Sequence, residues 1–167
     1  MTLPDHPELG GEPPAANEPS RGDDERTLLD GWLDYYRLAM VRKCAGLSYE
    51  QLAARSCPPS TMSLAGLVRH LTEMERAYAQ RLADPGLALR YVTSQRPDAD
   101  FDDATPGDVQ ADLVTFTEHW ERSREVMAAR PLDDGLRWHY LYLIKEYARH
   151  LGHADLLRER VDGATGE

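Results

Sequence analysis

Cysteine is scarce in this chain of 167 residues, and its placement excludes several kinds of site. The only two cysteines, Cys44 and Cys57, stand far apart and match no CxxC or zinc-ribbon spacing, so they predict neither a redox pair nor a thiolate metal site. We expect buried or idle thiols. The chain also lacks a glycine-rich phosphate-binding loop and a Gly-x-Ser-x-Gly nucleophile turn, so neither of those chemistries is indicated.

Positive charge is also sparse. Lysine and arginine together number 19 against 29 aspartates and glutamates, which gives a formal charge of −10. Binding to a phosphate backbone needs a concentrated cationic face, so we expect no nucleic-acid partner. No segment approaches about 18 uninterrupted apolar residues, and the first twenty residues lack a basic stretch followed by an apolar one. The expectation is a cytoplasmic protein without a membrane partner.

Residues 1–24 contain little that could pack into a core. They include five prolines among glycine, asparagine and acidic residues, with Leu3 and Leu9 as the only large aliphatic side chains. Such a segment buries too little apolar surface to offset the entropy lost on ordering. We therefore expect a disordered N-terminal tail over residues 1–24 and one domain over residues 25–163.

Apolar residues in the rest of the chain recur three and four positions apart, which is the spacing of one helix face. The pattern occupies four long segments and leaves almost no strand signal. It predicts an all-α four-helix bundle. The first, second and fourth expected helices span residues 24–44, 63–83 and 136–161, and the third begins at residue 106.

Capping residues and breakers set the expected helix ends. Ser63 is a candidate N-cap for the second helix, and Gly163 is the natural stop of the fourth. Thr105 and Asp108 have the spacing of a capping box for the third. In the connections, we expect one or two short turns over residues 47–55, and a short strand or turn over residues 87–92.

The inward face of the last helix carries polar groups. His150 occupies a position of the apolar seam, and Glu146 lies one turn before it on the same side. Burying an ionisable side chain without a partner is costly, so such groups must be paired, hydrated or bound to a cation. The E-x-x-x-H spacing lets Glu146 and His150 reach one common point. It therefore predicts a metal site, with a simple hydrogen-bonded pair as the alternative.

A further ligand must come from another helix, because two leave a divalent cation under-coordinated. His70 is the only histidine of the second helix and lies at the border of its apolar stripe. Two histidines and a carboxylate suit zinc, iron or nickel and leave positions open for water or substrate. The alternative is a core histidine satisfied by a carbonyl group. His153, one turn after His150, is interpreted as a capping residue or as a group behind the ligands.

Two motifs stand out: S-L-x-G-L-V-x-H-L in the second helix and E-x-x-R-H-x-G-H-A-D-L-L-R-E in the fourth, and the second of these is long enough to be specific. Through them the chain, over Thr27–Gly163, resembles the DinB/YfiT-like superfamily, in particular its actinobacterial branch related to mycothiol-dependent transferases and mycothiol-dependent maleylpyruvate isomerase. The resemblance implies an up-down-down-up bundle with one metal ion, held by a histidine of the second helix and a pair of residues in the last. His70, Glu146 and His150 stand at those positions.

Two positions of the fourth helix depart from the commonest pattern of the relatives. Many relatives have histidine at the position of Glu146, whereas the mycothiol-dependent isomerase branch has glutamate. His153 stands where others carry glutamine. It could replace Glu146 as a ligand, so the resemblance leaves the third ligand open.

The resemblance implies a metal-dependent thiol S-transferase. A low-molecular-weight thiol, mycothiol or bacillithiol, would occupy an open position on the metal, with zinc as the first choice and nickel or iron as alternatives. It would attack an electrophilic small molecule as thiolate. Arg81 and Arg149 are the candidates for binding an anionic part of the thiol or substrate. The alternatives are a metal-dependent hydrolase or isomerase, with His153 as the catalytic residue that moves protons, or a non-catalytic binding protein. A monomer and a homodimer are both compatible.

Overall fold

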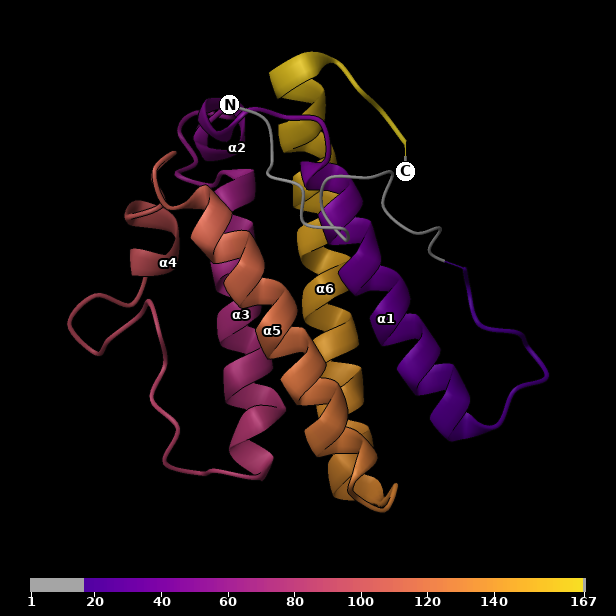
Figure 1. Cartoon of the computed structure of the whole chain (residues 1–167). Helices are drawn as coiled ribbons and strands as arrows, with labels where there is room; N and C mark the ends of the chain where they lie inside the picture. The colour runs from indigo at the N-terminus through magenta and orange to yellow at the C-terminus, as the bar shows by residue number, and fades with distance from the viewer. Residues whose placement is uncertain (1–16, 167) are drawn as a thin grey trace.

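The computed structural model describes residues 17–166, whose four long helices form an up-down-down-up bundle (Figure 1). No strand occurs in this part of the chain, so the predicted all-α fold is confirmed. No helix within it is long and apolar enough to cross a membrane. The long helices are α1 (Glu25–Cys44), α3 (Leu64–Tyr78), α5 (Val109–Ala128) and α6 (Asp134–Asp162), and the connections contain α2 (Tyr49–Ala53), the 3-10 turn η1 (Gln80–Leu82) and α4 (Ala99–Asp102).

α6 packs along both α1 and α3, and α3 packs along α5. α3 and α5 run in the same direction, so the chain between them must return along the bundle (Figure 1). Residues 79–108 make this return and place α4 against α3. The core between the long helices consists of fully buried apolar side chains, among them Leu67, Leu71, Phe116, Leu143 and Tyr147.

Side chains satisfy the first backbone N–H groups of three long helices, as helix starts require. Asp24, Ser63 and Asp133 each accept a hydrogen bond from the amide three residues later. At the other end of α6, Gly163 has a φ of 79°, a conformation that glycine adopts without strain. Ser63 and Gly163 therefore act as the sequence predicts, whereas α6 begins two residues earlier than expected, at Asp134.

Two predicted helix ends are wrong. α3 ends at Tyr78 rather than at residue 83, and the chain continues as η1, where the Gln80 side chain donates to the carbonyl of His119 at 2.8 Å. α5 begins at Val109 rather than at residue 106. The Thr105 hydroxyl does donate to Asp108, at 2.6 Å, but this bond closes the turn before the helix.

Residues 87–92 form no strand, and a buried carboxylate holds this segment instead. Glu73 of α3 accepts hydrogen bonds from the backbone amides of Arg90, Tyr91 and Val92, and two of these measure 2.8 and 3.1 Å. A carboxylate can accept several such bonds, and they satisfy a charge that would otherwise be buried alone. The turn therefore depends on a residue of α3 rather than on a partner strand.

The predicted tail falls mostly on residues 1–16, which lie outside the described part of the chain. Within residues 17–24, the Ser20 amide donates to Asp23 at 2.8 Å, and Asp24 caps α1. Pro19 packs against α1 so closely that a Cβ atom at Gly31 would lie 2.8 Å from the Pro19 Cβ. The domain boundary itself stays a prediction.

A buried ion pair ties three of the long helices together. Arg37 of α1 donates from Nε and Nη2 to the two carboxylate oxygens of Glu75 on α3, at 2.8 and 2.9 Å. The hydroxyl of Tyr147 on α6 donates to the same carboxylate at 2.7 Å. All three residues are fully buried. The Glu75 carboxylate is thus satisfied from both other helices, and Nη1 of Arg37 donates to Asp34 of its own helix at 2.9 Å.

Candidate metal centre

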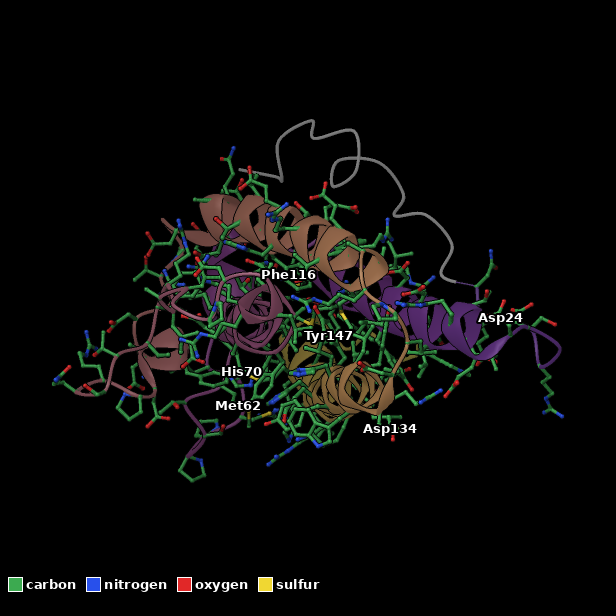
Figure 2. The ribbon with its side chains drawn as sticks, turned by 90° about the horizontal axis from the view of Figure 1, so that it is seen from below. Asp24, Met62, His70, Phe116, Asp134 and Tyr147 are labelled. Carbon is green, nitrogen blue, oxygen red and sulfur yellow. The ribbon has the colours of Figure 1, made fainter. Side chains whose placement is uncertain are left out.

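α3 and α6 run antiparallel and bring three potential ligands to one place. His70 of α3 lies between these helices in the view from below (Figure 2). Its Nε2 atom lies 4.0 Å from Oε2 of Glu146, and Nε2 of His150 lies 3.4 Å from the same oxygen. One ligand atom from each residue lies within 4.8 Å of the others. The structure thus joins the three residues that the sequence singles out.

The state of the His70 ring shows that these residues fit a cation. Its Nε2 atom is buried, and no described residue lies within hydrogen-bonding distance of it. A buried nitrogen without a partner is costly, and a metal ion would satisfy it. Ligand atoms about 2.1 Å from a tetrahedral ion lie about 3.4 Å apart, which is close to the spacings to Glu146. Two imidazoles and one carboxylate suit zinc, iron or nickel.

Electrostatics keep the pair on α6 in metal-binding protonation states. Burial, with repulsion from His70 and His153, lowers the pKa of His150 to about 4, so its imidazole is neutral at pH 7. Burial opposes ionisation of Glu146, but its ion pair with Lys145 and the nearby His150 and His70 together lower its pKa below the usual value. A neutral imidazole and an ionised carboxylate are the forms that coordinate metals.

Asp100 of α4 orients the His70 ring, and the sequence analysis missed it. Nδ1 of His70 lies 2.9 Å from Oδ2 of the buried Asp100. Because a carboxylate accepts hydrogen bonds, we assign the ring proton to Nδ1, which leaves the Nε2 lone pair directed towards Glu146. The ring of Phe101 stacks on His70 with centroids 5.2 Å apart. Asp100 is one of four aspartates within six residues, so no sequence pattern distinguishes it.

Gly66 makes room for α4 beside α3. A Cβ atom at Gly66 would lie 3.0 Å from Cδ1 and 3.3 Å from Cα of Phe101. The absence of a side chain therefore permits the close approach that brings Asp100 to His70.

His153 contacts His150 on the side of the ring that faces away from Glu146. The two Nδ1 atoms lie 3.3 Å apart. His153 is not part of the convergent group, whose third member is Glu146. A catalytic role for His153 stays a prediction.

The two candidate arginines, Arg149 and Arg81, lie at different places relative to the metal centre. Arg149 precedes His150 and is exposed. Arg81 lies in η1, beyond the end of α3, where its Nε donates to the carbonyl of Leu87 at 2.9 Å. Binding of an anionic group by either residue stays a prediction. Of the cysteines, Cys44 is buried as expected, and burial raises its pKa to about 12.

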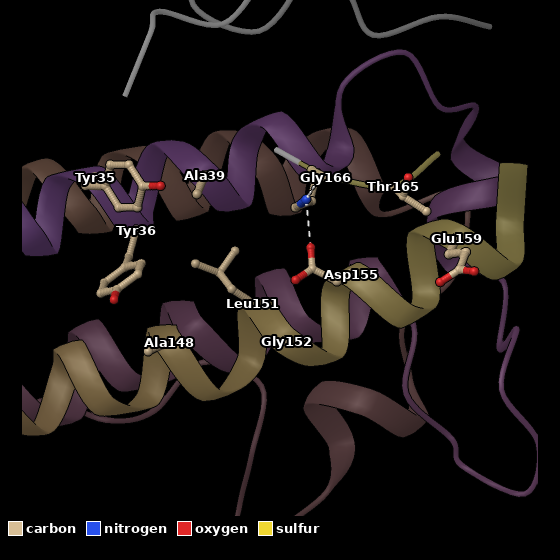
Figure 3. A pocket seen from close by; sticks show the side chains of 11 residues that line it. Tyr35, Tyr36, Ala39, Ala148, Leu151, Gly152, Asp155, Glu159, Thr165 and Gly166 are labelled. Atoms are coloured by element: carbon tan, nitrogen blue, oxygen red, sulfur yellow. Dashed lines mark hydrogen bonds and ion pairs between the residues drawn. The ribbon is translucent and has the colours of Figure 1, made fainter. Parts of the chain in front are cut away.

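A separate cavity lies between α1 and α6, under the C-terminal residues (Figure 3). It measures about 460 Å³, and none of the three convergent residues lines it. In it, Lys43 forms an ion pair with Asp155 at 2.7 Å and a hydrogen bond with the carbonyl of Gly166. The Lys43 ammonium in this cavity is therefore already paired.

The helical topology and the His/Glu/His cluster between α3 and α6 define a DinB-like helical bundle with a candidate metal centre. A family model described as Mycothiol-S-transferase matches residues 28–163. The chain therefore belongs to the mycothiol S-transferase family. No curated protein and no solved structure matched the chain.

Proposed function

We propose that this protein is a metal-dependent thiol S-transferase that joins mycothiol to an electrophilic small molecule. Membership of the mycothiol S-transferase family supports the thiol and the type of reaction. The unpartnered, buried Nε2 of His70, directed towards Glu146 and His150, carries the metal part of the proposal. Zinc is the ion we propose, with nickel or iron as the alternatives for this donor set.

When bound, such an ion lowers the pKa of a coordinated thiol, so that the nucleophilic thiolate is present at neutral pH. The residues of this chain set the geometry. Asp100 holds His70 through Nδ1, and His153 contacts Nδ1 of His150, so both rings present Nε2 to the same place. Because protein contacts already fix both rings, little reorganisation is needed on binding.

The reaction forms a bond between sulfur and the electrophilic carbon and breaks the bond to the leaving group, which departs with its electron pair. The thiol proton passes to solvent. His153, half-buried beside His150, is the residue we propose to carry that proton. Arg149 is the candidate for holding an anionic part of the thiol or substrate, since it is exposed next to His150.

The proposal is tested with wild type and the His70→Ala and His150→Ala variants. Wild-type protein purified without chelator should contain about one zinc, nickel or iron ion per chain, and the two variants much less. With mycothiol and an alkyl halide, metal-loaded wild type should form the conjugate faster than the thiol alone. Cys44→Ser and Cys57→Ser should keep this acceleration, because the thiol comes from the co-substrate.

Two results would overturn the proposal. Equal metal content in all three proteins would remove the metal centre. If neither mycothiol nor bacillithiol bound the metal-loaded protein by calorimetry, transfer would give way to the alternatives of a metal-dependent hydrolase or isomerase, or a non-catalytic binding protein.

A further inference from the structure

Three aromatic side chains lie beside the metal centre along α3 and α6, on the turns that precede Glu146 and follow His70. The Tyr142 ring lies 4.0 Å from that of Tyr78 and 5.0 Å from that of Trp138, between centroids, with interplanar angles of 30° and 23°. We call Tyr78, Trp138 and Tyr142 the aromatic platform. Successive turns of α6 carry Trp138, Tyr142, Glu146 and His150, and successive turns of α3 carry His70, Met74 and Tyr78.

Trp138 is the exposed ring of the platform, whereas Tyr78 and Tyr142 are half-buried. Trp138 is 52% exposed and the adjacent Leu141 59%, and within residues 17–166 only one other large hydrophobic side chain, Leu156, is comparably exposed. Single exposed apolar residues need no explanation, but a tryptophan stacked with two tyrosines beside a polar centre forms a surface that favours a ligand.

Lys145 connects the platform to the metal centre. Its ammonium lies 3.8 Å from the centroid of the Tyr142 ring and forms an ion pair with Oε1 of Glu146. Tyr142 is one helical turn, about 5.4 Å, from Glu146. A molecule that reacts at the metal centre would therefore place a neighbouring group of one ring's width at the Tyr142 end of the platform.

The chemistry of the platform indicates what that group is. Its half-exposed ring is Trp138, and its own hydrogen-bonding groups are two phenol hydroxyls and one indole N–H. A polyhydroxylated sugar needs many more partners, whereas a flat apolar ring needs only stacking. This surface therefore suits the acceptor better than it suits the sugar and inositol of the thiol.

Building on the proposed transferase function, we propose that the aromatic platform binds the acceptor, and that the acceptor carries an aromatic ring next to its electrophilic carbon. For a benzylic halide, the sulfur–carbon bond forms as the carbon–halogen bond breaks. Halide leaves with the bonding electrons, and the thiol proton goes to solvent. The platform holds the ring while the benzylic carbon faces the metal centre.

The test compares benzyl bromide with allyl bromide, which is similarly activated but has no ring. Both are assayed with mycothiol and metal-loaded wild type, Trp138→Ala and the control Leu156→Ala, which removes an equally exposed apolar side chain of α6. Because one aromatic contact is lost, Trp138→Ala should lower kcat/KM for benzyl bromide about fivefold, mainly through KM, and for allyl bromide by less than about twofold. Leu156→Ala should change neither.

Three outcomes of this assay would overturn the acceptor site. The first is an equal loss of kcat/KM for both bromides in Trp138→Ala. The second is a rise in KM for mycothiol rather than for the bromide, which would assign the platform to the thiol. The third is conversion of a wild-type dimer to monomer by sedimentation in Trp138→Ala without a selective loss, which would assign it to a subunit contact.

A binding measurement separates this inference from the proposed function. The indole N–H resonance of Trp138, identified by its absence in Trp138→Ala, is followed in metal-loaded wild type during titration with benzyl alcohol or allyl alcohol. A saturable shift with benzyl alcohol alone supports the platform, even if no bromide is conjugated and the transferase function fails. No shift with benzyl alcohol overturns the platform, even if conjugation occurs.

Discussion

The carboxylate of Asp100 accepts a hydrogen bond from Nδ1 of His70 at 2.9 Å, and this contact decides which nitrogen of His70 faces α6. It joins α4, a four-residue helix in the connection between α3 and α5, to a residue of α3 that stands 30 positions earlier. The ring can turn about χ2 without this bond, and Nε2 would then lose its direction.

Asp100→Ala should weaken zinc binding by about 10- to 100-fold, the usual effect of losing a hydrogen-bond partner of a ligating histidine. Asp100→Asn should lose less, because its amide oxygen still accepts from Nδ1. Competition with a zinc-binding dye measures the affinity. Asp102→Ala, on the exposed side of α4, serves as the control. Equal affinity of Asp100→Ala and Asp102→Ala would show that Asp100 does not orient His70.

A methyl group at Gly66 should push α4 away from α3, because the added Cβ would meet both the ring and the backbone of Phe101. Gly66→Ala is therefore expected to lower both the melting temperature and the zinc affinity. Gly152→Ala in α6 is the matched control, since no atom lies within 4 Å of its added Cβ. The control should gain up to about 1 kcal/mol from helix propensity. A Gly66→Ala variant as stable as this control would refute the close approach.

The third ligand can be decided by comparing Glu146→Ala with His153→Ala. Glu146 converges on the two Nε2 atoms, whereas His153 contacts only the far side of His150, so Glu146→Ala should lose more zinc affinity. Zinc binding also raises the melting temperature, because it stabilises only the folded state. The zinc-induced rise should be smaller for Glu146→Ala than for His153→Ala. The reverse order would make His153 the ligand.

Glu75→Ala should destabilise the bundle by about 3–5 kcal/mol, because it removes the buried carboxylate that pairs with Arg37 and leaves only Asp34 beside the guanidinium. Tyr147→Phe removes one hydrogen bond to the same carboxylate and should cost about 1 kcal/mol. Urea unfolding measures both. As a control, Glu125→Ala removes an exposed ion pair with Arg122 and should change stability by less than about 0.5 kcal/mol. If Glu75→Ala matched this control, the ion pair would not stabilise the bundle.

The four long helices, the caps at Ser63 and Gly163, and the pairing of Glu146 with His150 follow from local sequence. Apolar periodicity, N-cap hydrogen bonds and the spacing of one helical turn each depend on residues only a few positions apart. That is why they could be predicted without knowing how the helices pack. Local spacing could not identify His70 as the third member of the metal centre. That prediction came from its place at the border of an apolar stripe and from family resemblance.

The tertiary structure alone decided the surroundings of the candidate metal centre. Asp100 reaches His70 only because residues 79–108 return along the bundle and Gly66 admits α4, and neither contact is encoded within one segment. Tyr78 meets Trp138 and Tyr142 for a similar reason, because the antiparallel register of α3 and α6 aligns residues more than fifty positions apart. Such contacts depend on packing between distant segments, for which a single sequence carries no periodic signal.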